Sequence, residues 1–308
     1  MQAILGSGGA IGNPLAKELK AHTNKIRLVA RNPKKVNEDD ELFVADLVKK
    51  DVVNDAVACC EIVYLTVGLL YNSKVWQKDW PVVMRNVIDA CIEHKAKLVF
   101  LDNVYMYSPS EMGHMTEKSK MEPGSKKGKV RLKLVNMIFD AIKNEGLIAL
   151  IARSADFYGP NIKSSVMEIG VFDKFKKNQK AFWQADASKI HSFTFTPDAA
   201  KAVAILGNTP DAYNQVWHLP TSSENWTGKD FIETIAKEMN VKPRYYILSK
   251  FMISLISLFS SEVKELKEMQ YQNDRDYFFD SKKFNEQFTL VPTSYSEGIK
   301  EIVSKYSL

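Results

Sequence analysis

Cysteine is scarce in this chain of 308 residues, which contains only three. Cys59, Cys60 and Cys91 offer neither an even disulfide framework nor the paired spacing of a zinc site. Histidine is sparse as well, and no two of the five histidines have the spacing of metal ligands. The sequence therefore predicts no metal site, and the lack of a disulfide framework indicates a reducing compartment, by default the cytoplasm.

A long apolar run is also missing. The most apolar stretch, Phe251 to Phe259, is far shorter than the roughly 20 residues that a membrane-spanning helix needs. We expect it to form a buried helix of a smaller second lobe. The chain starts at Met1 and reaches a glycine-rich turn at Gly6, which leaves no room for a signal segment. No membrane partner is predicted.

Neither sign of charge dominates, because 42 Lys and Arg stand against 37 Asp and Glu, a formal net charge of +5. This mild excess fits a small anionic ligand, and no helix-turn-helix, zinc or RNA-binding signature accompanies it. We therefore predict a small-molecule substrate and no nucleic-acid partner. The hydrophobic content of 45% is that of a globular protein, and the length exceeds one simple core.

The first half of the chain alternates short apolar runs with amphipathic stretches. Strands are predicted at six places: Gln2–Leu5, Ile26–Ala30, Leu42–Ala45, Ile62–Val67, Leu98–Leu101 and Leu147–Ala152. Between them, Leu15 and Leu19 share one helical face, and Val83, Val87 and Cys91 recur four apart on another. This pattern predicts an α/β fold, a Rossmann-type doubly wound parallel sheet with a smaller C-terminal substrate lobe.

The domain organisation follows from where this alternation weakens. After Tyr158, aromatic residues and lysines mix, and prolines interrupt the chain. We expect residues 1–157 to form an NAD(P)-binding Rossmann domain, to which parts of 190–220 return. Residues 158–308 are expected to form mainly a substrate-binding lobe.

A glycine-rich turn directly follows the first predicted strand, and Gly6, Gly9 and Gly12 stand three apart in it. Glycine lets such a turn tighten and lets a pyrophosphate approach the backbone, while the N–H groups of the following helix face the phosphates. The sequence therefore predicts a dinucleotide-binding turn made of Gly6, Ser7, Gly9, Ala10, Ile11 and Gly12. The alternative is a strand-to-helix turn without a ligand.

The residue at the end of the second strand selects between NAD and NADP in this kind of fold. An acidic residue there binds the ribose of NAD, whereas this chain has Arg31, followed by Lys34 and Lys35. A guanidinium supplies fixed positive charge and a fork of donors that suit the 2′-phosphate of NADP. NADP is therefore the predicted cofactor, with NAD as the alternative. Arg31 could also be an ordinary surface arginine.

Several further landmarks follow in order along the chain. They are Ala45-Asp46-Leu47, Tyr64-Leu65-Thr66-Val67-Gly68, Asn86, Asn103-Val104-Tyr105-Met106-Tyr107, Arg153, Asp156-Phe157-Tyr158-Gly159-Pro160 and Phe193-x-Phe195-x-Pro197-Asp198-Ala199-Ala200. With the glycine turn, they resemble the extended and atypical short-chain dehydrogenase/reductases, the group that contains NAD(P)-dependent epimerases and dehydratases of sugar nucleotides. The resemblance covers nearly the whole chain.

This resemblance implies further cofactor-binding residues. Asp46, followed by Leu47, would hold the adenine, while Val67 and Gly68 would line the path toward the nicotinamide. Asp46 could equally cap the end of the third strand.

The catalytic triad of the family is missing in its usual form. The position of its Ser or Thr is occupied by Asn103, and the Tyr-x-x-x-Lys pair of the next helix aligns with Lys127 and Arg131. Because four-residue spacing puts both side chains on one helical face, Arg131 could still bind the nicotinamide ribose. Lys127 could donate a proton if it is desolvated, or be a solvated lysine of a lysine-rich stretch. Tyr105 is a second candidate proton donor, or a core aromatic residue.

Two functional hypotheses result. The first is an NAD(P)-dependent oxidoreductase or epimerase/dehydratase-like enzyme with a non-standard proton donor, acting on an unidentified carbonyl or sugar-nucleotide-like substrate. The second is a catalytically silent NADP(H)-binding sensor or scaffold protein. The oligomeric state stays open. The resemblance implies a possible homodimer, because paired long helices, expected here around Val83–Cys91 and Val130–Phe139, make dimers common in the family.

Overall fold

The computed structural model describes residues 1–160, 162, 165–257 and 260–306. The chain divides into two compact units, each assembled from three separate stretches. The first unit comprises Met1–Met106, Lys126–Ser154 and Ala199–Leu219, and the second comprises Tyr107–Ser125, Ala155–Asp198 and Pro220–Leu308. The functional division at residue 157 stays a prediction, because compactness does not show what each unit binds.

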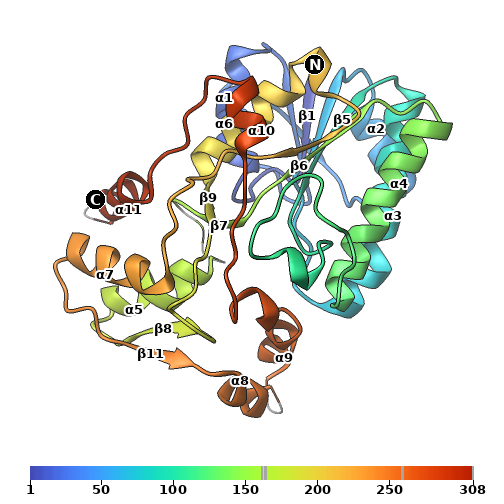
Figure 1. Cartoon of the computed structure of the whole chain (residues 1–308). Coiled ribbons are helices and arrows are strands. Elements are labelled where there is room, and N and C mark those ends of the chain that lie inside the picture. The colour runs from blue at the N-terminus through green and yellow to red at the C-terminus, as the bar shows by residue number, and fades with distance from the viewer. Residues whose placement is uncertain (161, 163–164, 258–259, 307–308) are drawn as a thin grey trace. The chain divides into compact units, whose positions relative to one another are not determined.

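A seven-stranded parallel sheet forms the centre of the first unit (Figure 1). Its strands, in spatial order, are β10 (Val216–His218), β6 (Ala149–Arg153), β5 (Lys97–Asp102), β4 (Ile62–Leu65), β1 (Gln2–Leu5), β2 (Ile26–Ala30) and β3 (Glu41–Val44). Ile4 on the central strand β1 is paired with Leu28 on β2 and with Tyr64 on β4. The chain runs outward from β1 in both directions, which is the doubly wound Rossmann order, so the predicted fold class is confirmed.

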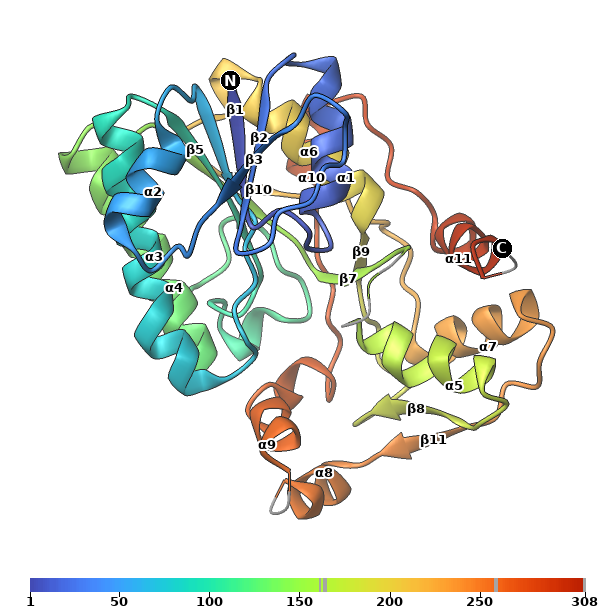
Figure 2. The ribbon, with the colours of Figure 1, turned by 180° about the vertical axis from the view of Figure 1, so that it is seen from behind.

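Helices cover both faces of this sheet (Figure 2). One face carries α2 (Lys50–Val57), α3 (Ser73–Glu93) and α4 (Lys126–Asn144), and the other carries α1 (Gly12–Glu18) and α6 (Thr196–Gly207). Their apolar residues turn inward as predicted: Leu15 on α1 is buried, and so are Val83 and Val87 on α3. Helical crossovers therefore connect β1 to β2, β3 to β4, β4 to β5 and β5 to β6, whereas β2 and β3 are joined by a loop.

All six predicted strands are present, with ends that lie within two residues of the prediction. The seventh strand, β10, has only three residues, Val216-Trp217-His218, and so gives no periodic pattern. It joins the sheet beside β6, where Trp217 is paired with Ala152.

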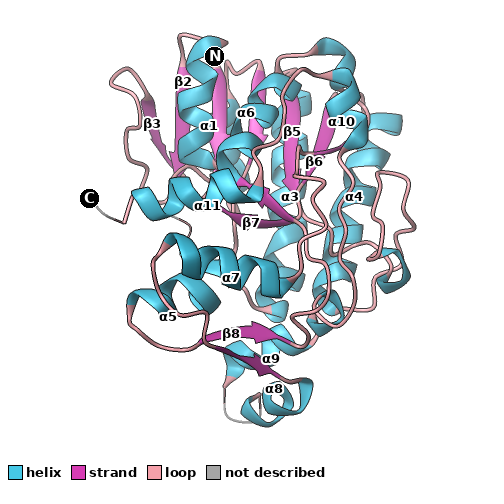
Figure 3. Ribbon diagram, turned by 60° about the vertical axis from the view of Figure 1, so that its left-hand side comes forward, coloured by secondary structure: helices cyan, strands magenta, loops and turns pink. Residues whose placement is uncertain are grey.

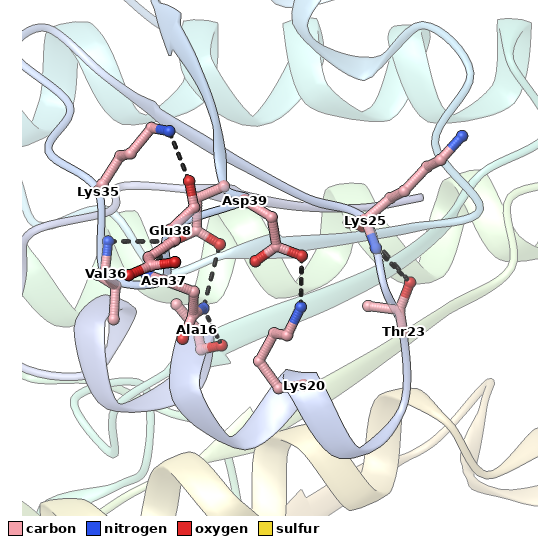
Figure 4. Close-up of polar contacts among 10 residues, drawn as sticks. Ala16, Lys20, Thr23, Lys25, Lys35, Val36, Asn37, Glu38 and Asp39 are labelled. Carbon is pink, nitrogen blue, oxygen red and sulfur yellow. Dashed lines mark hydrogen bonds and ion pairs between the residues drawn. The ribbon is translucent and has the colours of Figure 1, made fainter.

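The loop between β2 and β3 is tied to α1 by side-chain hydrogen bonds (Figure 4). Asn37 donates from Nδ2 to the carbonyl oxygen of Ala16 at 3.0 Å, and the carboxylate of Asp40 accepts the backbone N–H of Asn37 at 2.7 Å. At the surface, Lys20 pairs with Asp39 at 2.6 Å. These bonds stabilise the conformation of the segment that follows β2.

The second unit has two pairs of parallel strands, β7 (Asp156–Tyr158) with β9 (Phe193–Phe195) and β8 (Ala181–Gln184) with β11 (Tyr245–Leu248) (Figure 3). Its helices include α5 (Asp173–Lys176), α7 (Gly228–Glu238), α8 (Lys250–Ile256), α9 (Ser261–Lys267), α10 (Lys282–Gln287) and α11 (Tyr295–Ser304). A cluster of buried rings forms its core, among them Tyr158, Trp183, Phe193, Phe231 and Tyr295. The unit thus has a hydrophobic core of its own.

The apolar stretch at residues 251–259 does not form the buried helix that its composition suggests. Its described part belongs to α8, where Ile253 is the one buried residue and the Phe251 side chain is 76% exposed. Leu258 and Phe259 lie outside the described residues. The prediction of a buried helix is wrong for α8, because apolar composition does not show which face is covered. No helix formed by the described residues has the length and apolar character needed to cross a bilayer.

Candidate functional site

A cavity of about 500 Å³ opens at the carboxyl ends of the central strands of the first unit. Its walls come from the turn after β1, the ends of β2 and β3, the segment after β4, and α3. Eight of the predicted cofactor-binding residues line it, namely Gly6, Ser7, Gly9, Arg31, Asp46, Leu47, Val67 and Gly68. The volume lies in the range of about 300–1,000 Å³ that is usual for small-molecule sites.

The turn after β1 approaches the end of β4 so closely that position 6 requires glycine. Gly6 has a φ of +105°, and a Cβ atom there would lie 2.4 Å from the backbone N and Cα of Val67. At Gly9, by contrast, a Cβ atom would meet no protein atom closer than the Gly6 carbonyl oxygen at 3.5 Å. Since Gly9 lines the cavity, its missing side chain leaves the backbone open to a ligand there.

The helix after this turn begins at Gly12, and its N-cap residue is Ile11. Isoleucine has no side-chain acceptor, so its side chain does not bond the first N–H groups of α1. Such N–H groups can bind an anion. Ala10, Ile11 and Gly12 belong to this helix start and are not among the residues that line the cavity.

Arg31 is the cavity residue whose charge bears on the choice of cofactor. It is exposed at the end of β2, and its side chain makes no hydrogen bond or ion pair with any residue that the structure describes. Lys35 differs, because its Nζ donates to the carbonyl oxygen of Glu38 at 2.5 Å (Figure 4). The Arg31 guanidinium can therefore meet a ligand phosphate without breaking an existing interaction in the described chain.

Asp46 and Leu47 form the adjoining wall of the cavity. Asp46 accepts the backbone N–H of Val48 on Oδ1 at 3.3 Å, which is the capping bond expected at a strand end. Its carboxylate has a second oxygen, so the same side chain can cap the turn and still face a ligand. The Leu47 carbonyl accepts a hydrogen bond from Nδ2 of Asn86 at 3.0 Å, which ties this wall to α3.

The candidate proton donors lie near one another in the first unit. Lys127, the second residue of α4, is fully buried, and its Nζ is 4.5 Å from the ring centroid of Tyr71. The hydroxyl oxygens of Tyr71 and Tyr105 are 3.5 Å apart. The Tyr105 ring stacks on Trp76 with centroids 6.2 Å apart. Tyr71 thus lies between the two predicted donors, Lys127 and Tyr105.

Asn103 lies directly after β5 and is part of a tight turn. Its Oδ1 accepts the backbone N–H of Tyr105 at 3.0 Å. Asparagine side chains commonly make this bond to the backbone two residues on. The side-chain oxygen of Asn103 therefore orients the backbone that carries Tyr105.

Arg131 follows Lys127 by four residues on the same face of α4 and packs against aromatic side chains of the first unit. Its Cζ lies 4.4 Å from a ring centroid of Trp80 and 5.0 Å from one of Trp76. Its Nη1 is 3.5 Å from Oδ1 of Asp102. Because Trp76 and Trp80 are themselves four residues apart on α3, the guanidinium meets a continuous aromatic face of that helix.

Asp102, the last residue of β5, is close to two arginines. Its carboxylate is 3.5 Å from Arg131 and 3.6 Å from Nε of Arg153, and all three side chains are buried. Burial raises the pKa of Asp102, and the two guanidinium groups oppose that rise. Burial also lowers the pKa of Arg131, and Asp102 opposes that change. Since arginine stays protonated in proteins, the cluster holds positive charge inside the first unit.

Sequence reasoning missed Tyr71, Lys78 and Asp102. Tyr71 comes soon after the Val67-Gly68 landmark, at the carboxyl end of β4, and this placement is the signal that could have identified it. Lys78 lines the cavity from α3, where helical periodicity alone does not distinguish it from a solvated lysine. Asp102 immediately precedes Asn103, but its arginine partners come from distant stretches of the chain.

Metal-ligating side chains do not gather at this site. Across residues 1–160, 162, 165–257 and 260–306, no group of three or more His, Cys, Asp or Glu side chains is placed to hold a metal ion.

A family model described as the NAD dependent epimerase/dehydratase family matches residues 3–218 of the sequence. The chain belongs to this family. The matched region contains the seven-stranded sheet apart from its first residue, Gln2, and all the residues of the cavity. In this epimerase/dehydratase family member, the glycine turn and the cavity therefore lie within the region that defines the family.

Solved epimerase and dehydratase structures resemble this family member along its whole length. A UDP-N-acetylglucosamine 4-epimerase from Bacillus cereus is 18% identical, with a TM-score of 0.78 over 99% of this chain and 96% of its own. A UDP-glucose 4-epimerase from Thermus thermophilus, in complex with NAD, is 16% identical, with a TM-score of 0.78 over 100% and 99%.

A dTDP-glucose 4,6-dehydratase double mutant from Streptomyces venezuelae, also with NAD bound, is 12% identical, with a TM-score of 0.82 over 100% of this chain and 97% of its own. At such identities the likeness shows the fold. No curated protein matches the sequence.

Proposed function

We propose that this chain is an NADP(H)-dependent epimerase, dehydratase or reductase that acts on a sugar-nucleotide-like or other carbonyl substrate. One observation carries the proposal: a single cavity is lined by the glycine turn, by the exposed Arg31 and by Asp46. An anion-binding turn, a cation and an acid in that arrangement suit the pyrophosphate, the ribose phosphate and the adenine of a dinucleotide.

The residues of the cavity fit such a cofactor. The backbone of residues 6–12 would hold the pyrophosphate, and Asp46 with Leu47 would bind the adenosine. Val67 and Gly68 would border the path to the nicotinamide, where the open space around Gly68 leaves room for a flat ring. When bound, the nicotinamide supplies reversible hydride transfer at a substrate carbon.

NADP is proposed over NAD because of Arg31. Its guanidinium has no competing partner in the described chain, and the loop that follows it is stabilised by Asn37 and Asp40. A 2′-phosphate would therefore meet a cation on a preorganised segment. The two solved relatives described with a cofactor contain NAD, which keeps NAD as the alternative.

The proposed substrate class rests on the same relatives, which are UDP-sugar epimerases and a dTDP-glucose dehydratase. We propose that residues 158–308 contribute most of the substrate-binding residues. The second unit contains most of this segment and has its own aromatic core. A nucleotide-linked sugar is the first substrate to test.

Lys127 and Tyr105 are the proposed proton donors. As hydride leaves a substrate carbon, the hydroxyl oxygen on that carbon must lose a proton to a base, and the reverse step returns the proton. The buried Lys127 and the hydroxyl of Tyr105 are two groups able to exchange it, with Tyr71 between them. Nδ2 of Asn103 would donate a hydrogen bond to the substrate oxygen in place of the family's Ser or Thr.

The proposed hydrogen bond from Arg131 to the nicotinamide ribose would have to form although the guanidinium already packs against other side chains. The guanidinium lies over Trp80 and close to Asp102, so a hydrogen bond to a ribose would have to be made by a group already engaged on two sides. Arg131 therefore has a second candidate role, which is to hold α4 against α3.

The second candidate function, a silent NADP(H)-binding sensor or scaffold, is favoured by one specific observation. In the alignment that the resemblance implies, Lys127 and Arg131 take the family's tyrosine and lysine positions, and neither side chain reproduces a tyrosine acid supported by a lysine. A protein with this cavity could bind the cofactor without turning anything over.

A titration of the purified protein with NADPH and NADH measures cofactor binding. Incubation with UDP-glucose and NADP⁺, and of a panel of aldehydes and ketones with NADPH, then tests both functions. The enzyme proposal expects tight NADPH binding together with either a C4-epimerised or dehydrated sugar, seen by NMR, or loss of NADPH absorbance. Tight binding without any product supports the sensor. No binding of either dinucleotide would remove both proposals.

The homodimer stays a proposal as well, based on the paired long helices α3 and α4. Sedimentation velocity would detect it as a species of twice the monomer mass, and a concentration-independent monomer would exclude it.

A further inference from the structure

Helix α8 of the second unit presents an unusually apolar surface. Phe251, Met252, Leu255 and Ile256 are 76%, 39%, 52% and 40% exposed, while Ile253 is buried. In a helix, positions separated by four residues lie on the same face, so these four side chains form one continuous strip. We call this strip, with the neighbouring Tyr246, the α8 face.

The α8 face continues onto the adjoining strand pair. Tyr246 on β11 is 44% exposed, and its ring centroid lies 6.2 Å from that of Phe182 on β8. Figures 1 and 2 show β11 leading into α8 along one edge of the second unit. The exposed apolar side chains thus extend from the strand pair onto the helix. They form one continuous patch, in contrast to the isolated exposed apolar residues that are normal on a protein surface.

The charges at the β11 end of this face are positive, whereas at the α8 end Lys250 pairs with Asp274 and the next helix, α9, carries Glu265. Residues 239–261 contain no Asp or Glu, but they contain Lys242, Arg244 and Lys250. The segment before β8 adds Lys177 and Lys180, and it lies next to Arg244 because the N–H of the first β8 residue donates to the Arg244 carbonyl at 2.9 Å.

Most of this positive charge is not neutralised locally. Lys177, Lys180 and Lys242 are exposed and make no ion pair with any residue in the described part of the chain. Arg244 donates to Asn178, which is uncharged, at 3.2 Å. Lys250 is the exception, because it pairs with Asp274.

The occupant that complements an apolar face with unpaired cations at its β11 end is apolar and anionic. An anionic lipid surface has both properties, since acyl chains lie below a layer of negative headgroups. A second copy of the same face would bring like charges together, which opposes association. With only seven residues, α8 is suited to lie in the interface and not to span it.

We propose that the α8 face docks the protein peripherally on anionic bilayers, with Phe251 and Leu255 inserted among the lipids and Lys177, Lys180 and Lys242 facing the headgroups. This differs from the sequence expectation, which considered only membrane-spanning segments and assigned residues 251–259 to the core. The proposal does not depend on the cavity, so the failure of either one leaves the other intact.

Co-sedimentation with vesicles tests the docking. The whole protein is mixed with vesicles of phosphatidylcholine and phosphatidylserine, and in parallel with vesicles of phosphatidylcholine alone. We expect binding to the mixed vesicles that weakens as salt is raised, because the attraction to headgroups is screened. No binding to the mixed vesicles at low salt, or equal binding to both kinds, would overturn the proposal.

Two variants separate the apolar and the charged contributions. Phe251→Ser with Leu255→Ser removes the apolar insertion without changing the charge, and about a tenfold or greater loss of vesicle affinity is expected. Replacing Lys177, Lys180 and Lys242 with Gln keeps the apolar face, and a loss of about five-fold per lysine is expected.

The control is Val291→Ser, which alters an exposed apolar residue outside the α8 face and should leave vesicle binding unchanged. All substituted side chains are exposed, so equal urea midpoints are expected for every variant. Undiminished vesicle binding by both the serine and the glutamine variants would overturn the proposal. A different outcome would assign the face to a second copy of the chain. In that case the wild-type protein does not bind vesicles but forms a dimer in sedimentation velocity, and the serine variant abolishes the dimer.

Discussion

A methyl group at Gly9 tests the cavity most directly, because it separates ligand binding from folding. In Gly9→Ala the new Cβ meets no protein atom closer than 3.5 Å. We therefore expect the free energy of unfolding to change by less than about 0.5 kcal/mol. The same atom would stand where a pyrophosphate approaches the turn. Each hydrogen bond lost to a charged phosphate costs about 1.5–3 kcal/mol, so the dissociation constant for NADPH should rise at least about tenfold.

Gly6→Ala should give a different result. Its φ of +105° is unfavourable for alanine, and the Cβ would overlap backbone atoms of Val67 at 2.4 Å. Left-handed backbone alone costs roughly 1–2 kcal/mol, and a backbone neighbour cannot turn aside as a side chain can. We expect a loss of more than about 2 kcal/mol in the free energy of unfolding.

Urea unfolding followed by tryptophan fluorescence gives the stabilities, and a fluorescence titration with NADPH gives the affinities. Gly113→Ala is the matched control, since a Cβ there meets nothing within 4 Å and the residue lies away from the cavity wall in sequence. Wild-type affinity in Gly9→Ala would refute the placement of the cofactor. A loss of stability in Gly9→Ala as large as that in Gly6→Ala would refute the geometry of the turn.

Four further substitutions test the remaining roles. Arg31→Asp should lower the affinity for NADPH by about tenfold or more and the affinity for NADH much less. Lys35→Ala is the control and should leave both affinities unchanged. Equal losses of affinity for the two dinucleotides would exclude a 2′-phosphate contact. Lys127→Met and Tyr105→Phe should each lower turnover while leaving the NADPH dissociation constant unchanged, and full activity in both would eliminate both as donors. Arg131→Met should leave NADPH affinity unchanged if the guanidinium only packs against α3, whereas a loss of about tenfold would support the ribose contact.

The sheet was open to prediction because its strands carry their own signal. β1 and β2 are apolar apart from Gln2 and Arg27, and the glycine turn after β1 fixes where the first helix begins. A strand buried on both faces is mostly apolar, and so it is recognisable without knowledge of its neighbours. The three-residue strands β7, β9 and β10 are too short for such a pattern, and only their tertiary partners define them.

The candidate site was predictable where its residues follow the ends of predicted strands. Gly6, Arg31 and Asp46 are placed by the ends of strands, and the cavity includes all three. The four-residue spacing of Lys127 and Arg131 predicts a shared helical face, but it does not say what that face meets. That Arg131 lies against aromatic rings of α3 depends on the packing of two helices, which no local pattern encodes.

The misjudged helix α8 has a related cause. The residues of its strip are as apolar as core residues, and the hydrophobic effect rewards their burial wherever a partner surface exists. The apolar composition of a helix shows that burial would be favourable, but it does not show whether a partner surface covers the helix. Local sequence therefore could not distinguish a core helix from one that is left exposed.

The assembly of the first unit from three stretches has a consequence for how the protein is made. β10 forms the outer edge of the sheet beside β6, yet it leaves the ribosome roughly 60 residues after β6 does. At synthesis rates of about 5–20 residues per second, β6 would present an unpaired edge for about 3–12 seconds. A chain stopped near residue 157 would keep that edge permanently and lack the partner that bonds to Arg153 and Ile151. The nascent protein is therefore most exposed to aggregation during synthesis of residues 155–215, when a chaperone covering one strand edge would protect it.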